Sequence, residues 1–264
     1  MKNAHLLITN DDGIFADGIQ YLAQSLYEDD NQYRLSVFAP DRERSAVGHA
    51  ITMHKPLRVE KVTLFNNPDL IGWSVNGTPS DSVKLALEAI LDNKPDMVLS
   101  GINRGSNLGT DVLYSGTVSA AVEGLIMGIP SIAISLTGKG NSESYNFTAS
   151  LIKSMIPRLL DQQFPASTLI NINVPVDVER IKGVRVTHLG TRRYCNAFDK
   201  RIDPRGMTYY WLAGELVDED EKQPDSDTKA IKEGYVSITP IHFQLTNEQI
   251  IPELTRLVKD LPLL

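Results

Sequence analysis

Two adjacent carboxylates, Asp11 and Asp12, end the apolar run in the stretch "LLITNDDGIFADG" (residues 6–18) and are followed by glycine. Neighbouring like charges repel each other, so they coexist most easily when a cation compensates them. Hard divalent ions such as Mg²⁺ and Mn²⁺ take carboxylate, amide and hydroxyl oxygens as ligands. Asp-Asp-Gly also suits a simple turn after a strand, because both residue types are common in turns. The dipeptide alone leaves both interpretations open.

A second polar stretch, "SGINRGSNLGTDVLYSGTVSAAVEG" (100–124), has glycine at every fourth position from Gly101 to Gly109, interleaved with Asn103 and Asn107. Glycine permits unusual backbone angles and the close approach of a ligand, and asparagine amides offer neutral donors and acceptors. The alternative is a long glycine-rich connection without a ligand. Its length and polarity between apolar segments favour a binding loop.

The same stretch then opens a helix with Ser115, Gly116 and Thr117. Hydroxyl groups and free N–H groups at a helix N-terminus suit an anion, and phosphate above all. An ordinary serine or threonine cap would look the same. The segment therefore predicts a phosphate site next to the glycine-rich loop.

Several better-known catalytic patterns are absent from the sequence. It contains neither a Walker A loop nor a dinucleotide-binding glycine fingerprint after the first strand, and no nucleophile-elbow pattern. The single cysteine, Cys195, excludes an internal disulfide and a cysteine-based metal cluster. The histidines show no metal-ligand spacing, and they are His5, His49, His54, His188 and His242.

The elements that must position these residues alternate between strand-like and helix-like patterns over the first 175 residues. Apolar runs predict strands over 5–10, 33–40, 96–103, 130–136 and 168–173. Helical spacing of apolar residues predicts helices over 18–28, 80–91, 115–128 and 146–160. This alternation predicts an α/β fold with a mostly parallel sheet.

The polar clusters all follow predicted strands. Asp11 and Asp12 follow the first strand, "DRERS" (41–45) the second, and "NRGSNLGTD" (103–111) the strand at 96–103. Ligands of open parallel sheets bind at the carboxyl ends of the strands. Three oxygen-rich loops are therefore expected at one edge, which favours a metal over a simple turn at Asp11 and Asp12.

After about residue 176 the pattern changes, so we divide the chain into a catalytic core (1–175) and a β-rich C-terminal extension (176–264). "GVRVTHLG" and "GYVSITPIHFQLT" predict strands. Between them, seven acidic residues within positions 215–227 predict a solvated loop or hairpin tip. The aromatic residues just before it, including Trp211, suit an exposed arm that packs on another subunit. Residues 246–261 predict a closing helix, with Thr246 as its cap.

Composition limits the classes of partner. The net charge of −7 argues against a nucleic-acid-binding surface, which would need clustered lysine and arginine. No run approaches the ~18 apolar residues of a membrane-spanning helix. Because the N-terminus reads as a first strand and not as a signal peptide, we expect a cytoplasmic protein without a membrane or a stable nucleic-acid partner.

The sequence resembles the stationary-phase survival protein SurE family, a family of metal-dependent 5′/3′-nucleotidases. Five blocks carry the resemblance in order along nearly the whole chain, and the long central one is highly specific: "ITNDDGIFADGI", "APDRERSAVGHAIT", "VNGTPSDSVKLAL", "LSGINRGSNLGTDVLYSGTVSAAVEG" and "GYVSITPI". The resemblance implies a Rossmann-like sheet with helices on both faces. It also implies a C-terminal hairpin that exchanges between subunits to form a homodimer or homotetramer.

The resemblance further implies roles for individual residues. One divalent ion, Mg²⁺ or Mn²⁺, would be held by the following residues: Asp11, Asp12, Ser45 and Asn103. The phosphate would be surrounded by Asn107 and the turn Ser115, Gly116 and Thr117. Asp11, Asn107 and Ser115 are the catalytic candidates. One departure is visible, because Ala46 stands after the metal-ligand serine where glycine is common in the family.

The function expected from the resemblance is removal of phosphate from nucleoside 5′-monophosphates, with 3′-nucleotidase and exopolyphosphatase activity in some members. We expect in-line attack by metal-activated water without a phospho-enzyme, with Asp11 as the general base. The alternative is a non-catalytic nucleotide-binding regulatory protein that keeps the loops without turnover. A metal-dependent hydrolase of amides or esters is disfavoured by the lack of histidines at zinc spacing.

Overall fold

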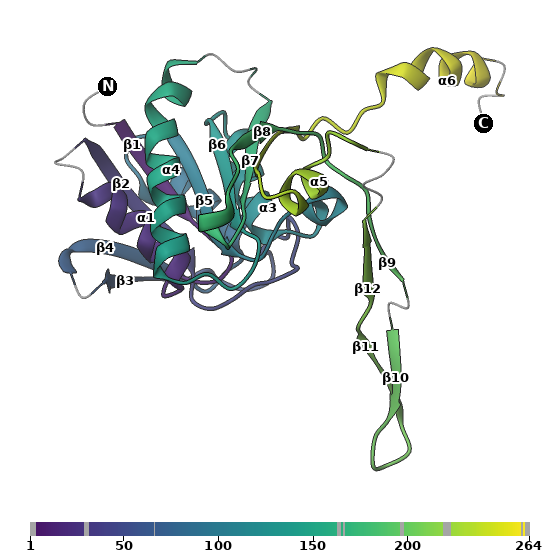
Figure 1. The fold of residues 1–264 in the computed structure, drawn as a ribbon, viewed down its shortest axis with the longest axis horizontal. Coiled ribbons are helices and arrows are strands. Elements are labelled where there is room, and N and C mark those ends of the chain that lie inside the picture. The colour runs from purple at the N-terminus through teal and green to yellow at the C-terminus, as the bar shows by residue number, and fades with distance from the viewer. Residues whose placement is uncertain are drawn as a thin grey trace.

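A nine-stranded sheet forms the body of the protein in the computed structural model (Figure 1). The structure describes residues 4–28, 32–65, 67–162, 165, 167–195, 198–218, 223–259 and 261. The strand order is β3-β4-β2-β1-β5-β6-β7-β13-β8. In that order the strands span Val59–Leu64, Asn67–Val75, Tyr33–Pro40, Ala4–Thr9, Met97–Arg104, Ser131–Leu136, Thr168–Val174, Val236–His242 and Val184–Val186.

The pairs from β4 to β7 are all parallel, and antiparallel pairing occurs where β3 meets β4 and where β7 meets β13. The predicted α/β fold with a mostly parallel sheet is confirmed. β8 and β13, which come from beyond residue 175, join the same sheet as the earlier strands. The hairpin of β3 and β4 was not predicted from the sequence.

Helices cover both faces of the sheet because successive strand residues point to opposite sides. Leu6 and Ile8 of β1 belong to the core that α1 (Asp17–Tyr27) and α4 (Ser142–Asp161) cover, in front of the sheet in Figure 1. Leu7 belongs to the core beneath α2 (Pro79–Leu85) and α3 (Gly116–Ile126) on the other face. The helix predicted over 80–91 changes at Ala86–Ile90 to a π-helical turn.

β1 lies between β2 and β5, so the chain winds away from β1 in both directions. Such a reversal of strand order opens a crevice at the carboxyl edge of the sheet, where ligands bind in doubly wound folds. Asp11 and Asp12 follow β1 at this edge. The fold therefore places the two carboxylates at the switch point.

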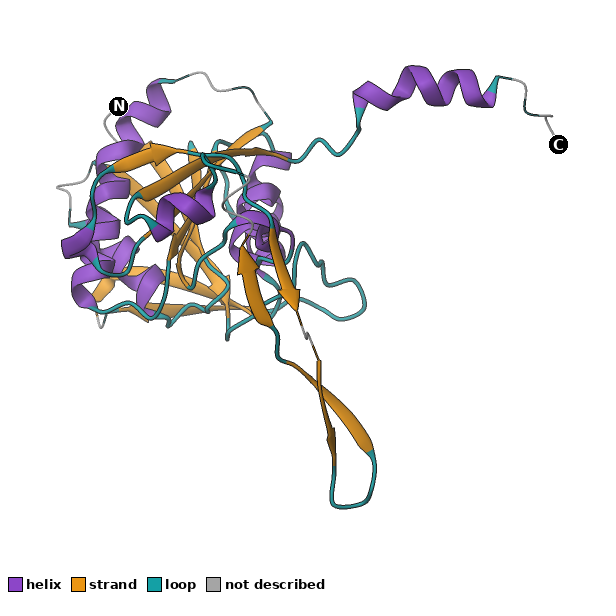
Figure 2. Ribbon diagram, turned by 45° about the vertical axis from the view of Figure 1, so that its right-hand side comes forward, coloured by secondary structure: helices purple, strands orange, loops and turns teal. Residues whose placement is uncertain are grey.

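A long two-stranded arm leaves the body between β8 and β13 (Figure 2). Its strands β9 (Arg192–Cys195) and β12 (Glu215–Asp218) pair with each other, as do β10 (Phe198–Ile202) and β11 (Thr208–Leu212). The arm turns at residues 203–207, where the Asp203 N–H donates to the Met207 carbonyl at 2.9 Å.

The acidic segment was predicted as a loop or hairpin tip, and this is wrong for its first part. Glu215–Asp218 is the returning strand β12, and α5 (Asp227–Lys232) begins at the other end of the acidic segment. Backbone pairing with β9 holds this strand, and the side chains of residues 215–217 are exposed. Residues 219–222 lie outside the described residues.

The closing helix is shorter than predicted. Short 3₁₀ turns occur at Gly109–Leu113, Val178–Arg180 and Glu248–Ile250, and the last of these leads into α6 (Ile251–Val258). Thr246 was expected to cap this helix, which is wrong: α6 begins after Ile250 without a side-chain cap, and Asn247 caps the preceding 3₁₀ turn, its Oδ1 accepting from the Gln249 N–H at 3.1 Å. α6 lies apart from the body in both views. Among the described residues, no helix is long and apolar enough to cross a membrane.

Candidate metal and phosphate site

A tight turn after β1 fixes the two acidic side chains. The Asn10 side chain brackets this turn, since its Nδ2 donates to the Gly13 carbonyl at 2.9 Å and its Oδ1 accepts from the Gly13 N–H at 3.2 Å. Asp11 is only 6% exposed and Asp12 is half-buried. The turn and metal interpretations are therefore compatible, because an asparagine-stabilised turn is what presents both carboxylates.

Asp11 meets the N-terminus of α3. The Thr117 hydroxyl donates a hydrogen bond to Asp11 Oδ1. A Cβ added at Gly116 would lie 2.7 Å from Asp11 Cβ and 2.9 Å from Asp11 Oδ2, so only glycine allows this approach. Burial raises the pKa of Asp11 to about 6, against the opposing effect of the Thr117 hydroxyl and backbone and with a further rise from the charge of Asp12.

Asp12 is joined to the end of β5. Its Oδ2 accepts from the Arg104 N–H at 2.9 Å, and burial raises the pKa of Asp12 as well. Asn103 precedes this contact on β5, and its Nδ2 donates to the Gly105 carbonyl at 2.8 Å. That bond commits the amide nitrogen and so sets the orientation of the Asn103 side chain.

The donor set fits a hard divalent cation. Asp11 and Asp12 are buried or half-buried carboxylates, and no lysine or arginine among the described residues forms an ion pair with either. Burial of these charges is costly and raises both pKa values, although Thr117 offsets part of the cost for Asp11 and Arg104 offsets part for Asp12. An oxygen-coordinated cation would remove the remaining cost.

The loop that carries Ser45 is tied to the same point. The Arg44 N–H donates to the main-chain carbonyl of Asp11 at 2.8 Å. Ser45 itself is exposed and its hydroxyl donates to Glu43 Oε1 at 2.6 Å. Ala46 has a φ of 54°, in the left-handed region that favours glycine, so the alanine occupies a glycine-like backbone position.

Ser115 caps α3, the role that the sequence left open as the alternative to a phosphate site. Its Oγ accepts from the Val118 N–H at 3.0 Å, and its carbonyl accepts from the Ser119 hydroxyl at 2.6 Å. Helix positions before Val118 have N–H groups without an intrahelical partner. The helix therefore directs its positive end toward Asp11.

Asn107 is held by hydrogen bonds to β6 and β7, and not by contacts with Asp11 or Asp12 among the described residues. It is buried, and its N–H donates to Asn173 Oδ1 at 2.8 Å while its carbonyl accepts from the side chains of Asn171 and Asn173 at 2.9 and 3.0 Å. Its own Nδ2 donates to Ser135 Oγ at 2.8 Å. These hydrogen bonds join Asn107 to Ser135, Asn171 and Asn173, so they fix the position of its loop.

The hydrogen bonds between Asn107 and the two asparagines of β7 were not predicted from the sequence. Asn171 and Asn173 lie on β7 within "TLININV", a segment interpreted as a simple apolar strand. Asparagine at two alternate positions of a buried strand was the available signal, because buried amides need partners. Both side chains anchor the loop that follows β5.

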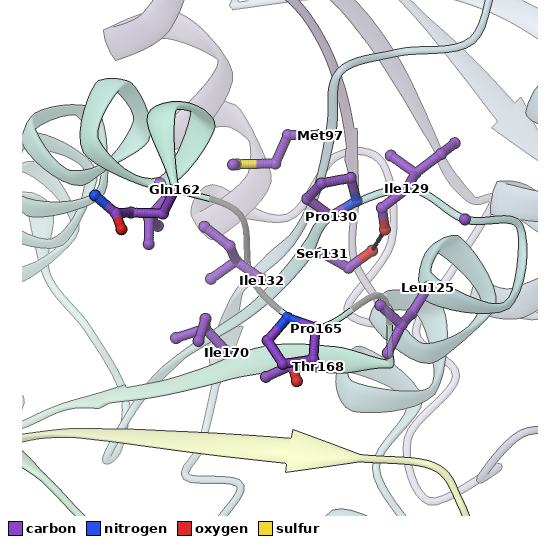
Figure 3. Close-up of a pocket in the computed structure, with 12 residues that line it drawn as sticks. Met97, Leu125, Ile129, Pro130, Ser131, Ile132, Gln162, Pro165, Thr168 and Ile170 are labelled. Atoms are coloured by element: carbon purple, nitrogen blue, oxygen red, sulfur yellow. Dashed lines mark hydrogen bonds between the residues drawn. The ribbon is translucent and has the colours of Figure 1, made fainter.

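A cavity of about 360 Å³ lies at the opposite, amino edge of the sheet (Figure 3). Met97, Ile132 and Ile170, which line it, lie near the starts of β5, β6 and β7. None of the described residues that line it is ionisable. The described lining therefore offers no acid or base, and the carboxylates Asp11 and Asp12 lie elsewhere, after β1.

Comparison with known proteins agrees with this arrangement. The sequence model of the family described as "Survival protein SurE" matches residues 6–196. The chain belongs to the SurE family. The match includes every residue singled out at the carboxyl edge of the sheet, from Asp11 to Asn173.

Relatives of the SurE family extend the similarity over nearly the full chain. The chain is 53% identical over 258 residues to the 5′-nucleotidase SurE of Carboxydothermus hydrogenoformans, covering 97% of both chains. It is 54% identical to the 5′-nucleotidase SurE of Pelotomaculum thermopropionicum, covering 98% of this chain and 97% of the other. The crystal structure of the SurE protein from Aquifex aeolicus is 41% identical, with a TM-score of 0.81 and coverage of 96% and 99%.

Proposed function

We propose that this protein is a metal-dependent 5′-nucleotidase, which hydrolyses nucleoside 5′-monophosphates to nucleoside and phosphate. The observation that carries the proposal is the close approach of Gly116, at the N-terminus of α3, to the buried carboxylate of Asp11. A cation site and an anion site thereby adjoin each other. The relatives named 5′-nucleotidase SurE support the same activity.

The proposed metal ligands are Asp11, Asp12, Ser45 and Asn103, around one Mg²⁺ or Mn²⁺. Support comes from the hydrogen bonds that tie three loops to one point: Arg44 N–H to the Asp11 carbonyl and Arg104 N–H to Asp12 Oδ2. When bound, the ion offsets the negative charge of the substrate and lowers the pKa of a bound water.

The chain's own residues would bind and orient the phosphate. Ser115, Gly116 and Thr117 supply hydroxyl and N–H groups at the positive end of α3. Asn107 has its main chain fixed by β7, so it would keep the glycine-rich loop rigid around the phosphate. Phosphoryl transfer depends mainly on positioning and on stabilisation of charge, and this arrangement serves both.

Asp11 is the proposed general base. Thr117 occupies its Oδ1, so the proton of the attacking water would go to Oδ2, the oxygen beside Gly116. In-line attack then forms a bond between the water oxygen and phosphorus as the bond between phosphorus and the ester oxygen breaks. The nucleoside leaves with the ester oxygen, which takes up a proton from solvent water, and phosphate is released without a covalent enzyme intermediate.

Phosphate release from a nucleoside 5′-monophosphate tests the function, with Asp11→Ala and Asn103→Ala as variants. Both variants should abolish release and retain the circular dichroism and unfolding midpoint of a folded protein. Near-normal release by either would reject the site. Binding of the nucleotide without release by the wild-type protein would instead indicate the non-catalytic alternative. Phosphate release from nucleoside 3′-monophosphates and from polyphosphate then shows which other substrates the protein hydrolyses.

We further propose that the arm joins copies of this chain into a homodimer or homotetramer. Phe198, Trp211 and Leu212 on β10 and β11 are 67%, 60% and 75% exposed, and large apolar residues in this setting mark an interaction surface. A two-stranded ribbon without a covering layer is only marginally stable alone. Light scattering should give an oligomer for the wild-type protein and a smaller species for Trp211→Ser, whereas Met53→Ser on the body should not change the mass. A monomeric wild-type protein would reject this proposal.

A further inference from the structure

A fully buried carboxylate, Asp227, lies where the arm leaves the body. Its Oδ2 accepts from the Gly109 N–H at 2.8 Å, and its Oδ1 accepts from the N–H groups of Gly190 and Thr228, each at 2.8 Å. Two of these partners are distant in sequence, Gly109 in the glycine-rich loop and Gly190 in the segment before the arm, while Thr228 is the next residue of α5. We propose that Asp227 is a positioning residue that holds the glycine-rich loop of the site against the root of the arm.

The two glycines are in direct backbone contact. Gly109 has a φ of +53°, and a Cβ added there would lie 2.7 Å from the Gly190 carbonyl oxygen. A side chain at Gly190 would meet Thr228 Oγ1 at 2.6 Å. The carboxylate therefore joins two segments that no side chain separates, so a shift of one segment displaces the other.

Two further contacts connect the same loop to the arm. The Thr110 hydroxyl donates to the main-chain carbonyl of Arg192, the first residue of β9, at 2.8 Å. The Arg192 Nη1 forms an ion pair with Asp111 Oδ2 at 3.0 Å, with both side chains largely buried. Three consecutive residues of the loop, 109–111, are thus fixed at the root of the arm.

This loop lies between two parts of the candidate site. Asn103 precedes it and Ser115 follows it, and Asn107 within it is anchored to β7. The inference rests on the proposed nucleotidase function, since its effect is on the geometry of that site. Packing of a partner against the arm would then stabilise the conformation of the loop, which links assembly to turnover.

The carboxylate is suited to this role in a way that an amide is not. Asp227 accepts with both oxygens, whereas an asparagine side chain at this position would present a donor toward either Gly109 or Gly190 and leave that N–H unsatisfied. An unsatisfied buried donor is costly, so one segment would move away. Asp227→Asn therefore changes the contact with little change in shape.

The test compares Asp227→Asn with Asp225→Asn, an exposed carboxylate in the same segment. For each variant, kcat and KM for phosphate release, the Mn²⁺ affinity, the unfolding midpoint and the amide exchange of Gly109 and Gly190 are measured. We expect Asp227→Asn to lower kcat by about 10- to 100-fold at saturating metal, as displaced supporting residues do. Exchange at both glycines should be faster, Mn²⁺ affinity should be unchanged, and Asp225→Asn should match the wild-type protein.

Thr110→Val, with Thr63→Val on the exposed strand β3 as its control, provides the second test if Asp227→Asn does not fold. Thr110→Val removes the hydrogen bond from the Thr110 hydroxyl to the Arg192 carbonyl, and it should also lower kcat. A lower unfolding midpoint with wild-type kcat in the folded variants would overturn the inference, because it would mean a merely structural role. If the wild-type protein releases no phosphate, the proposed function fails, and unchanged amide exchange in Asp227→Asn would separately overturn the inference.

Discussion

The Thr117 hydroxyl donates its hydrogen bond to the carboxylate of Asp11, across 106 positions of sequence. This contact joins the end of β1 to the first turn of α3 on the edge of the sheet where strand order reverses. A group expected to bind phosphate is thereby a direct partner of a group expected to bind metal. The proposed metal and phosphate sites would therefore be continuous.

Thr117→Val should remove this bond without changing the shape of the side chain. We expect phosphate release to fall by about 10- to 100-fold, because a misoriented ligand weakens both metal binding and attack. The free energy of unfolding should fall by about 1–3 kcal/mol, since the buried carboxylate loses a donor. Steady-state kinetics and denaturant titration measure both, and Thr63→Val serves as the control. Unchanged kinetics would mean that Thr117 does not orient Asp11.

Gly116→Ala should place a methyl group against Asp11, 2.7 Å from its Cβ. Overpacking of this kind costs about 1–3 kcal/mol, and displacement of a reacting group by about 1 Å costs on the order of 100-fold in rate. We therefore expect a greater loss of kcat/KM than of stability. Gly138→Ala is the matched control, because a Cβ there would meet Val176 at an ordinary 3.7 Å. Equal kinetics in the two variants would contradict the close approach.

The main elements could be predicted because their patterns are local. The apolar run that becomes β1 and the Ser-Gly-Thr start of α3 fall within one residue of the observed bounds. β3 and β4 were missed, since "VEKVTL" is an edge strand with charged residues and Pro68 interrupts the start of β4. Edge strands bury little surface, so their sequences lack the apolar run of the central strands.

Ala46→Gly tests the one visible departure from the family pattern. Because Ala46 adopts a φ of 54°, the alanine bears a backbone strain that glycine does not. The variant should leave phosphate release intact and raise the free energy of unfolding by up to about 1 kcal/mol. Ala50→Gly in the same loop, outside the left-handed region, should lower it. A clear loss of stability in Ala46→Gly would contradict the strained backbone.

Glu123 makes the free energy of unfolding depend on pH in the acidic range. Hydrogen bonds from His49 Nε2 at 2.7 Å and Lys84 Nζ at 3.3 Å hold the pKa of this buried carboxyl below its ordinary 4.5, with the His49 bond as the largest cause. A lowered folded-state pKa means that the charged form stabilises the fold. This stabilisation is complete above pH 4.5 and is lost as the pH falls through the folded-state pKa.

Denaturant titrations of wild-type protein and Glu123→Gln between about pH 7 and about pH 3 measure this effect. The variant should be less stable by about 1–3 kcal/mol at about pH 7, and the difference should narrow below about pH 4.5. Glu88→Gln is the control, because Glu88 pairs with Lys84 at the exposed surface, at 3.3 Å. A difference that stays constant with pH would contradict the assignment.

The parts of the site that could not be predicted depend on tertiary contacts. Asp225 and Asp227 lie in one acidic segment with the same local sequence character, yet one is exposed and the other fully buried. Only the return of the chain to Gly109 and Gly190 distinguishes them. Asn171 and Asn173 likewise acquire their role from the main chain of Asn107, to which they are joined across 64 and 66 positions of sequence.

Phosphate release from a nucleoside 5′-monophosphate as a function of added Mg²⁺ or Mn²⁺, after complete chelation, tests the central proposal most directly. The wild-type protein should release no phosphate in chelator and should recover in a saturable manner as metal is added. Asp11→Asn, which keeps the size of the side chain and removes its charge, should not recover at any metal concentration. Release that persists in chelator, or wild-type recovery by Asp11→Asn, would contradict the account.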